Sequence, residues 1–160
     1  MGGSPVDLQE VTALNVQALR RLHQAVFPVP YGEAFYRHAR RAGPLARAAY
    51  VQGAMVGSVC CRWDTSEDRR RLYIMTLGTL PTYRRLGIGS ALLRYVLGLC
   101  EAECGERVVS SVYLHVQVGN EDALCFYGRF GFLVKGKACG YYPRQQHADA
   151  WVLERTLTDS

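Results

Sequence analysis

The sequence predicts one α/β domain with a central sheet, and three observations support this. The chain has 160 residues, 49% of them apolar, which suits a single compact domain with a real core. Strand-like runs alternate with runs of helical spacing along the chain. Glycines and prolines separate these runs, as expected of turns between regular elements. We expect the domain to span residues 5–157.

The first part of the chain predicts a strand and two helices. Residues 6–11 alternate loosely and can form a strand, and Thr12 can cap a helix that follows. That helix should end at residues 27–31, where two prolines forbid its continuation. A second, arginine-rich helix is expected over residues 33–41, and Gly43-Pro44 ends it.

The middle of the chain predicts antiparallel strands and a long helix. Strand-like runs cover residues 46–51, 55–62 and 71–77, with a Gly53 turn and a charged loop between them. Their short connections favour antiparallel pairing. An apolar segment over residues 90–104 then predicts a helix.

The last part predicts three strands and a short helix. Residues 108–118 are the strongest strand candidate, and Asn120 can cap a helix over residues 121–129 that Gly131 ends. Final strands are expected at residues 132–137 and 150–156.

Composition narrows the classes of function. The net charge is +5, and only Lys135 and Lys137 among the 19 basic residues are lysines. Such a surface can serve a phosphorylated cofactor, an acidic partner or nucleic acid, but no nucleic-acid-reading motif accompanies it, so we expect no direct nucleic-acid binding. The six cysteines lack zinc-ligand spacing and are expected to be reduced thiols, with no metal. No stretch predicts a membrane span, and we expect a cytoplasmic chain, with a nuclear pool left open.

A glycine-containing loop between a strand and a helix is the first functional signal. It reads Arg84-Arg85-Leu86-Gly87-Ile88-Gly89. Backbone N–H groups at such a loop and at the helix N-terminus can hold a phosphate. The alternative is a simple turn. The loop lacks the third glycine of a dinucleotide fingerprint and the Gly-Lys-Ser/Thr ending of a nucleotide triphosphate loop.

This loop resembles the pyrophosphate-binding signature of the GNAT acetyltransferase superfamily. A second segment, with Asn120, Ala123, Phe126, Tyr127 and Gly131-Phe132, resembles the closing signature of the same family. The resemblance implies the GNAT fold: a mixed, mostly antiparallel sheet flanked by helices on both sides. It also implies acetyl-CoA as the co-substrate. The residues it assigns to acetyl-CoA are Leu77, Arg84, Arg85, Leu86, Gly87, Ile88, Gly89, Asn120 and Tyr127.

Longer motifs are similar to the catalytic subunits of NatE-type N-terminal acetyltransferases. They lie at residues 27–29, 72–78, 83–89 and 113–116. The resemblance implies acetyl transfer to the α-amino group of peptides that start with Met. It further implies docking on the auxiliary scaffold subunit shared with the NatA complex. Two alternatives stay open: lysine side-chain acetylation, and a GNAT binding subunit that does little chemistry.

Three residues are candidates for proton transfer. An α-amino group has a pKa of roughly 8, so a modest base suffices to deprotonate it. Tyr73 and His115 lie within predicted strands, and the resemblance implies that both flank the substrate amine and bind a catalytic water. Tyr127 is a candidate proton donor to the departing thiolate. Ordinary packing is the alternative for each of the three.

Two aromatic loops are expected to recognise the substrate. The assigned residues are Phe27, Pro28, Val29, Tyr31, Met75, Tyr141 and Tyr142, and apolar walls of this kind suit a Met side chain. Loop packing is the alternative. The chain departs from the resembled family at Pro143 and Gln145, which bears on substrate preference.

Overall fold

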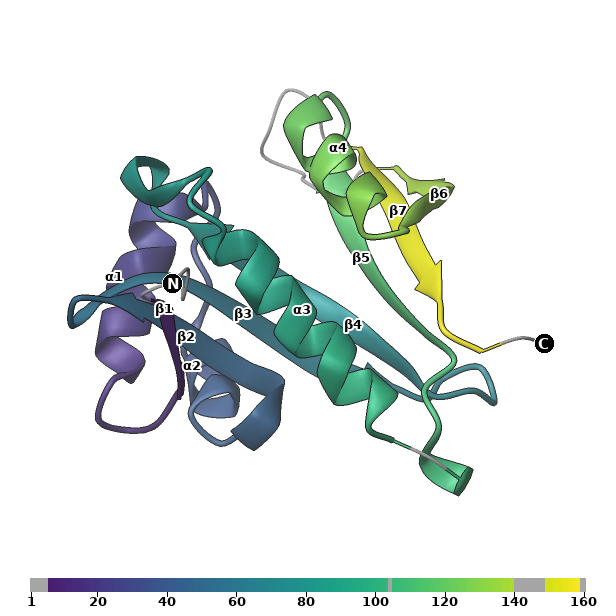
Figure 1. The fold of residues 1–160 in the computed structure, drawn as a ribbon, viewed down its shortest axis with the longest axis horizontal. Helices are drawn as coiled ribbons and strands as arrows, with labels where there is room; N and C mark the ends of the chain where they lie inside the picture. Colours follow the sequence, from purple (N-terminus) through teal and green to yellow (C-terminus); the bar gives the residue numbers. More distant parts are fainter. Residues whose placement is uncertain (1–5, 104, 140–148, 159–160) are drawn as a thin grey trace, which may run out of the picture. The chain divides into compact units, whose positions relative to one another are not determined.

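The structure is a computed structural model that describes residues 6–103, 105–139 and 149–158. Its helices are α1 (Val16–Val26), α2 (Glu33–Ala39), α3 (Ile88–Glu101) and α4 (Glu121–Arg129). Its strands are β1 (Val6–Glu10), β2 (Ala46–Val51), β3 (Ala54–Asp64), β4 (Arg71–Thr79), β5 (Ser111–Gln117), β6 (Leu133–Ala138) and β7 (Ala150–Thr156). The strands form one sheet in the order β1-β2-β3-β4-β5-β7-β6 (Figure 1).

The pairing within this sheet is mixed and mostly antiparallel, as predicted. β1 pairs with β2, β2 with β3, β5 with β7 and β6 with β7, all antiparallel. β4 and β5 are parallel and pair only from Arg71–Tyr73 to Ser111–Tyr113. The chain therefore needs a long crossover between these two strands, and α3 lies within it.

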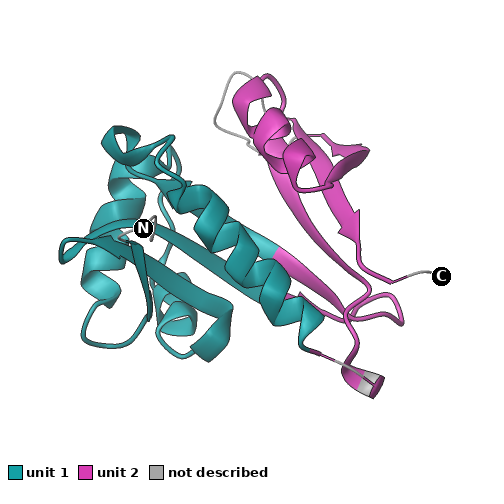
Figure 2. Ribbon diagram, viewed as in Figure 1, with its two compact units in different colours: residues 1–62, 74–102 teal, residues 63–73, 103–160 magenta. Residues whose placement is uncertain are grey.

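The chain falls into two compact units (Figure 2). The first comprises residues 1–62 and 74–102, and the second comprises residues 63–73 and 103–160. β3 and β4 each contribute to both units. The expectation of a single domain over residues 5–157 stays a prediction.

The first unit has helices on both faces of its strands. Cys60 in β3 and Ala48 in β2 belong to a buried cluster with residues of α1 and α2. Gly57 points to the opposite face, because side chains alternate along a strand. A Cβ at Gly57 would lie 3.1 Å from Ile88 Cγ2, so α3 packs directly on this face.

Two helix starts differ from the sequence prediction. α1 begins after Asn15, not directly after Thr12, because residues 13–15 form a turn; Asn15 makes no side-chain cap bond to the helix, and its Oδ1 accepts a hydrogen bond from the Thr12 amide at 2.8 Å. α3 begins at Ile88, two residues earlier than expected, with Gly87 as its N-cap. The predicted end of α1 before Pro28 is confirmed, since Phe27 N–H donates to the His23 carbonyl at 2.8 Å.

The second unit contains the β5-β7-β6 part of the sheet and α4. β5 begins at Ser111 instead of residue 108, because residues 105–107 form a short 3-10 helix and the Ser110 amide donates to the Arg70 carbonyl at 2.8 Å. The predicted cap of α4 is confirmed, since Asn120 Oδ1 accepts from the Ala123 amide at 3.1 Å. Gly131 ends this segment with a positive φ of 85°.

Candidate active site

The loop between β4 and α3, in the first unit, brings together the residues predicted to bind pyrophosphate. Arg85 and Gly87 both have positive φ values, 64° and 82°. Backbone amides in turns of this kind form concavities that bind anions. Gly87, the N-cap of α3, has no side chain with which to cap the helix, so the first-turn amides are available to an acceptor such as a phosphate.

The same loop is open to solvent and positively charged. Arg84, Arg85 and Leu86 are exposed. A Cβ at Gly87 would meet no heavy atom within 4 Å, and the first turn of α3 carries no acidic residue. A pyrophosphate can therefore reach the backbone here without meeting like charge. Leu77, also assigned to the co-substrate, is half-buried in β4.

The predicted peptide-binding residues of the first unit gather in an aromatic cluster. The rings of Phe27 and Tyr31 are edge-to-face with centroids 6.1 Å apart, and Tyr31 lies 4.7 Å from Phe35. Pro28 and Val29 are exposed beside them. Met75 is partly buried against the core cluster of this unit. Tyr141 and Tyr142 lie outside the described residues.

The centre of this aromatic cluster is His23, which the sequence analysis did not single out. Its ring centroid lies 5.1 Å from that of Phe27 and 5.6 Å from that of Tyr31. Its Nδ1 is 3.0 Å from the Tyr36 hydroxyl and its Nε2 is 3.4 Å from the Ser58 hydroxyl. Burial lowers the pKa of His23 to about 4, so the imidazole is neutral near pH 7. Helical spacing is the sequence signal that could have placed His23 on the buried face, because it lies one helical turn from both Leu19 and Phe27.

The second unit brings Tyr73 and His115 together. The Tyr73 hydroxyl is 2.9 Å from His115 Nδ1, and the two rings are edge-to-face at 5.5 Å. The parallel pairing of β4 and β5 sets Tyr73 opposite Tyr113, and alternation puts His115 on the same face as Tyr113. Burial lowers the pKa of His115 below its usual value, so this imidazole can accept a proton near neutral pH.

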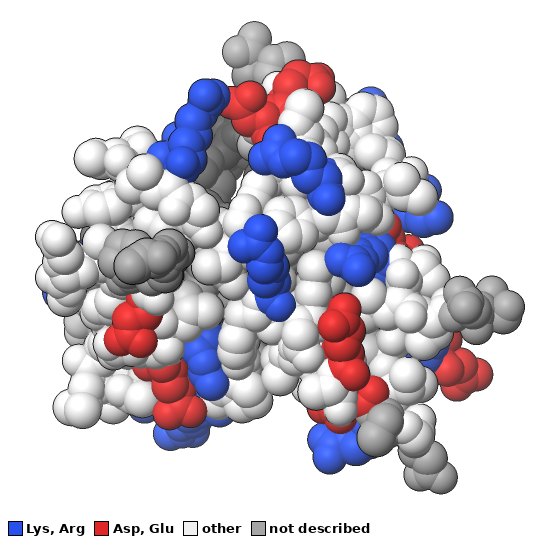
Figure 3. Space-filling view, in the orientation of Figure 1, with Lys and Arg blue, Asp and Glu red and all other residues white. Residues whose placement is uncertain are grey.

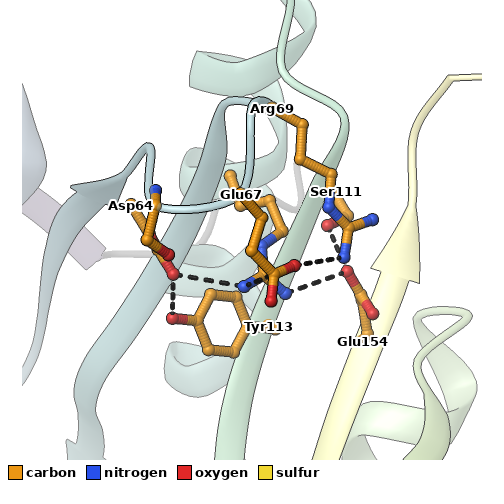
Figure 4. A network of polar contacts seen from close by, with 8 residues as sticks. Asp64, Glu67, Arg69, Ser111, Tyr113 and Glu154 are labelled. Carbon is orange, nitrogen blue, oxygen red and sulfur yellow. Dashed lines mark hydrogen bonds and ion pairs between the residues drawn. The ribbon is translucent and has the colours of Figure 1, made fainter.

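A half-buried polar network lies beside this pair (Figure 4). Tyr113 donates a hydrogen bond to Asp64 Oδ2, and its ring contacts that of Tyr73 in a tilted arrangement with centroids 4.8 Å apart. Arg71 lies 4.3 Å over the Tyr113 ring and pairs with Asp64 at 3.2 Å and with Glu154 at 3.6 Å. These contacts restrain the Tyr113 ring on which Tyr73 rests.

The sequence did not reveal that Asp64 and Arg71 form a network with residues of other strands. Hydrogen bonds from the Ser66 and Tyr113 hydroxyls hold the pKa of Asp64 below its usual range, so its charge persists beside Arg71. Ser111 donates to Glu154 from the neighbouring strand. In the sequence, Asp64 and Arg71 flank a highly charged segment, which is typical of a solvated loop.

α4 carries the remaining predicted residues. Asn120 uses its side chain to cap the helix and is itself exposed. Tyr127 is buried, with its ring 5.6 Å from that of Phe132 and 5.0 Å from that of Phe126. Tyr127 therefore packs within this unit, and its role as a proton donor stays a prediction.

The remaining observations concern metal ligands, membrane-spanning helices, cysteine reactivity and surface charge. Within the described parts of the chain, no group of three or more His, Cys, Asp or Glu side chains could hold a metal ion. No helix there has both the length and the apolar character needed to span a membrane. Burial raises the pKa of Cys60 to about 11, which makes that thiol a poor nucleophile. Figure 3 shows basic and acidic side chains interspersed on the face it draws.

Sequence comparisons find known proteins that are similar to this chain over most of its length. The sequence model of the acetyltransferase (GNAT) family matches residues 16–132. The chain is 46% identical to N-alpha-acetyltransferase 50 of Danio rerio over 152 residues, which cover 95% of this chain and 89% of the relative. It is 44% identical to the probable N-acetyltransferase san of Drosophila melanogaster, over 98% of this chain and 84% of that protein.

A solved structure agrees as well. The structure of Arabidopsis thaliana Naa50 in complex with the bisubstrate analogue CoA-Ac-MVNAL superimposes with a TM-score of 0.87. The sequences are 38% identical, and the match covers 96% of this chain and 99% of that one.

Proposed function

Because the chain belongs to the acetyltransferase (GNAT) family, we propose that it transfers the acetyl group of acetyl-CoA to the α-amino group of peptides that begin with Met. The observation that carries this proposal is the hydrogen bond between Tyr73 and a neutral, half-buried His115. Such a pair can remove a proton from an amine of ordinary α-amino pKa. The analogue bound to the Arabidopsis relative, which joins CoA to the peptide MVNAL, supports both substrates.

The co-substrate supplies an acetyl group activated as a thioester. The loop from Arg84 to Gly89 fits its pyrophosphate, because two left-handed residues and the start of α3 present amides beside two exposed arginines. Leu77, Asn120 and Tyr127 are assigned to the same molecule by the family resemblance.

The side chains of the second unit then manage the protons. His115 takes the proton that the amine loses, directly or through a water, as the new bond from nitrogen to the acetyl carbon forms. The Tyr73 hydroxyl, 2.9 Å from Nδ1, holds the imidazole in one orientation. Tyr127 gives a proton to the sulfur as the carbon–sulfur bond breaks, and solvent restores that proton. The products are an N-acetyl peptide and free CoA.

The aromatic cluster of the first unit receives the first side chain of the peptide. Phe27 and Tyr31 offer apolar ring surface beside Pro28, Val29 and Met75. A Met thioether makes favourable contacts with aromatic rings, which suits these walls. The predicted contributions of Tyr141 and Tyr142 remain part of this proposal.

Docking and location are further parts of the proposal. The resemblance to NatE-type subunits supports docking on the scaffold subunit shared with NatA, and a chain that works on newly made N-termini belongs in the cytoplasm, with a nuclear pool as the alternative. Co-purification of the tagged chain with that scaffold subunit, and imaging of the tagged chain in cells, test these two statements.

A peptide assay tests the central proposal. Three peptides are compared with acetyl-CoA: one with a free Met α-amine, the same peptide with a blocked α-amine and an internal lysine, and one with both groups free. We expect acetylation of the first and third only, at the α-amine, as mass spectrometry of fragments would show. Acetylation of the blocked peptide at the rate of the free one would instead establish a lysine acetyltransferase.

A further inference from the structure

The ring of Phe27 packs directly against the backbone of Gly78. Gly78 of β4 has no side chain, and a Cβ built there would stand 2.7 Å from Phe27 Cζ and 2.7 Å from Val26 Cγ1. Carbon atoms in normal contact are about 3.5–4.0 Å apart. The Phe27 ring can therefore occupy its place only because residue 78 is glycine.

Phe27 also contacts the His23 ring, which is itself held in place. His23 lies edge-to-face with Phe27 at 5.1 Å and is only 2% exposed. Its two ring nitrogens contact the hydroxyls of Tyr36 and Ser58, so it cannot turn without losing these contacts. The backbone adds a third restraint, since the Phe27 amide donates to the His23 carbonyl at 2.8 Å.

We propose that His23 and Gly78 are specificity-determining positioning residues, which hold Phe27 at a fixed depth and so set the size of the slot for the first side chain of the peptide. The inference rests on the proposed function, since it takes Phe27 as a wall of that slot. Neither residue touches the peptide in this account; both act through the Phe27 ring. The slot so formed takes a long, unbranched apolar side chain.

The size of the effect follows from the close approach. An alanine at position 78 would push the Phe27 ring, or β4 itself, by about 1 Å to restore normal contact. A change of one methylene in an apolar pocket alters discrimination between substrates by about 10- to 200-fold. We therefore expect Gly78→Ala to narrow the slot and to lower the preference for Met over Ala at the first position by about tenfold or more.

The experiment compares kcat/KM for two peptides that differ only in a first Met or Ala. Parent, Gly78→Ala, His23→Gln and the double variant are measured together. Gly98→Ala is the matched control, because a Cβ at Gly98 would meet no heavy atom within 4 Å. Calorimetry gives the acetyl-CoA Kd of each protein. We expect the Met/Ala ratio to fall in both single variants, less than multiplicatively in the double variant, with the acetyl-CoA Kd and the control unchanged.

Each outcome decides the matter. A folded Gly78→Ala variant whose Met/Ala ratio stays within about twofold of the parent's would overturn the inference while leaving the proposed function intact. If Gly78→Ala does not fold, an unchanged ratio in His23→Gln overturns it in the same way, and a lowered ratio supports it. A parent that acetylates no peptide α-amine would overturn both statements. A loss of acetyl-CoA binding together with the altered ratio would show general disruption and would also overturn the inference.

Discussion

The buried His23 should make the stability of this protein depend on pH in a defined window. Its pKa is about 4 in the folded chain against an ordinary 6.5, because burial disfavours the charged ring. When the pH falls below 6.5, His23 becomes protonated in the unfolded chain but stays neutral in the folded chain. The stability that neutral His23 contributes is therefore complete above pH 6.5 and is lost as the pH falls to about 4.

The magnitude follows from the two pKa values. Each pKa unit corresponds to about 1.4 kcal/mol, so the full loss is about 3 kcal/mol below pH 4, and about 2 kcal/mol has gone at pH 5. Between pH 7.5 and 8.5 the contribution of His23 should be flat.

Urea unfolding of the parent and of His23→Gln, followed by far-UV circular dichroism at pH 7.5, 6 and 5, measures this. Glutamine keeps polar atoms near Tyr36 and Ser58 but does not titrate. The other histidines are present in both proteins, so their contributions cancel. We expect the unfolding free energy of the parent to fall about 2 kcal/mol further than that of the variant between pH 7.5 and 5. Equal losses, within about 0.5 kcal/mol, would refute the reasoning and indicate that His23 is solvated in the folded chain.

Three further predictions concern the co-substrate, the proton path and the half-buried polar network. Gly87→Val should fold, at a cost of about 1–2 kcal/mol for its positive φ, yet lose acetyl-CoA affinity in calorimetry; unchanged affinity would remove this loop from the co-substrate site. Tyr73→Phe and His115→Ala should each lower kcat by about 10²-fold, and the double variant by less than the product, whereas fully multiplicative losses would mean separate roles. Arg71→Met should lower the unfolding free energy by about 1 kcal/mol, because it removes the cationic partner of two half-buried carboxylates that keep their hydroxyl donors, and a variant as stable as the parent in urea unfolding would contradict this.

Most elements could be predicted from local signals. β2, α4 and β7 have the predicted bounds. For β2 and α4 the reason is local, because Gly53, Asn120 and Gly131 mark turns and caps by their own backbone chemistry. The starts of α1 and α3 could not be placed as well. A turn at residues 13–15 separates Thr12 from the start of α1, and the left-handed Gly87 lets α3 begin inside the loop.

The parts of the candidate site that lie in recognisable sequence motifs could be predicted. The loop up to Gly89 and the residues Tyr73 and His115 were identified from the residues and the resemblance, and the structure places the latter two in hydrogen-bond contact. Asp64 was missed, because a carboxylate in a charged segment looks solvated until its partners are known.

The sequence alone determined the family, the alternation of helices and strands, and the phosphate-binding character of one loop, since these depend on residues close together in the chain. Only the tertiary structure decided the environment of His23 and Arg71. His23, on a helix, is a buried neutral ring because the fold packs it against segments distant in sequence, including Ser58, 35 residues away. An arginine in a charged segment becomes the centre of a network when Glu154 pairs with it across the sheet. Burial and charge pairing of this kind depend on contacts between distant segments, and local sequence carries no information on which segments meet.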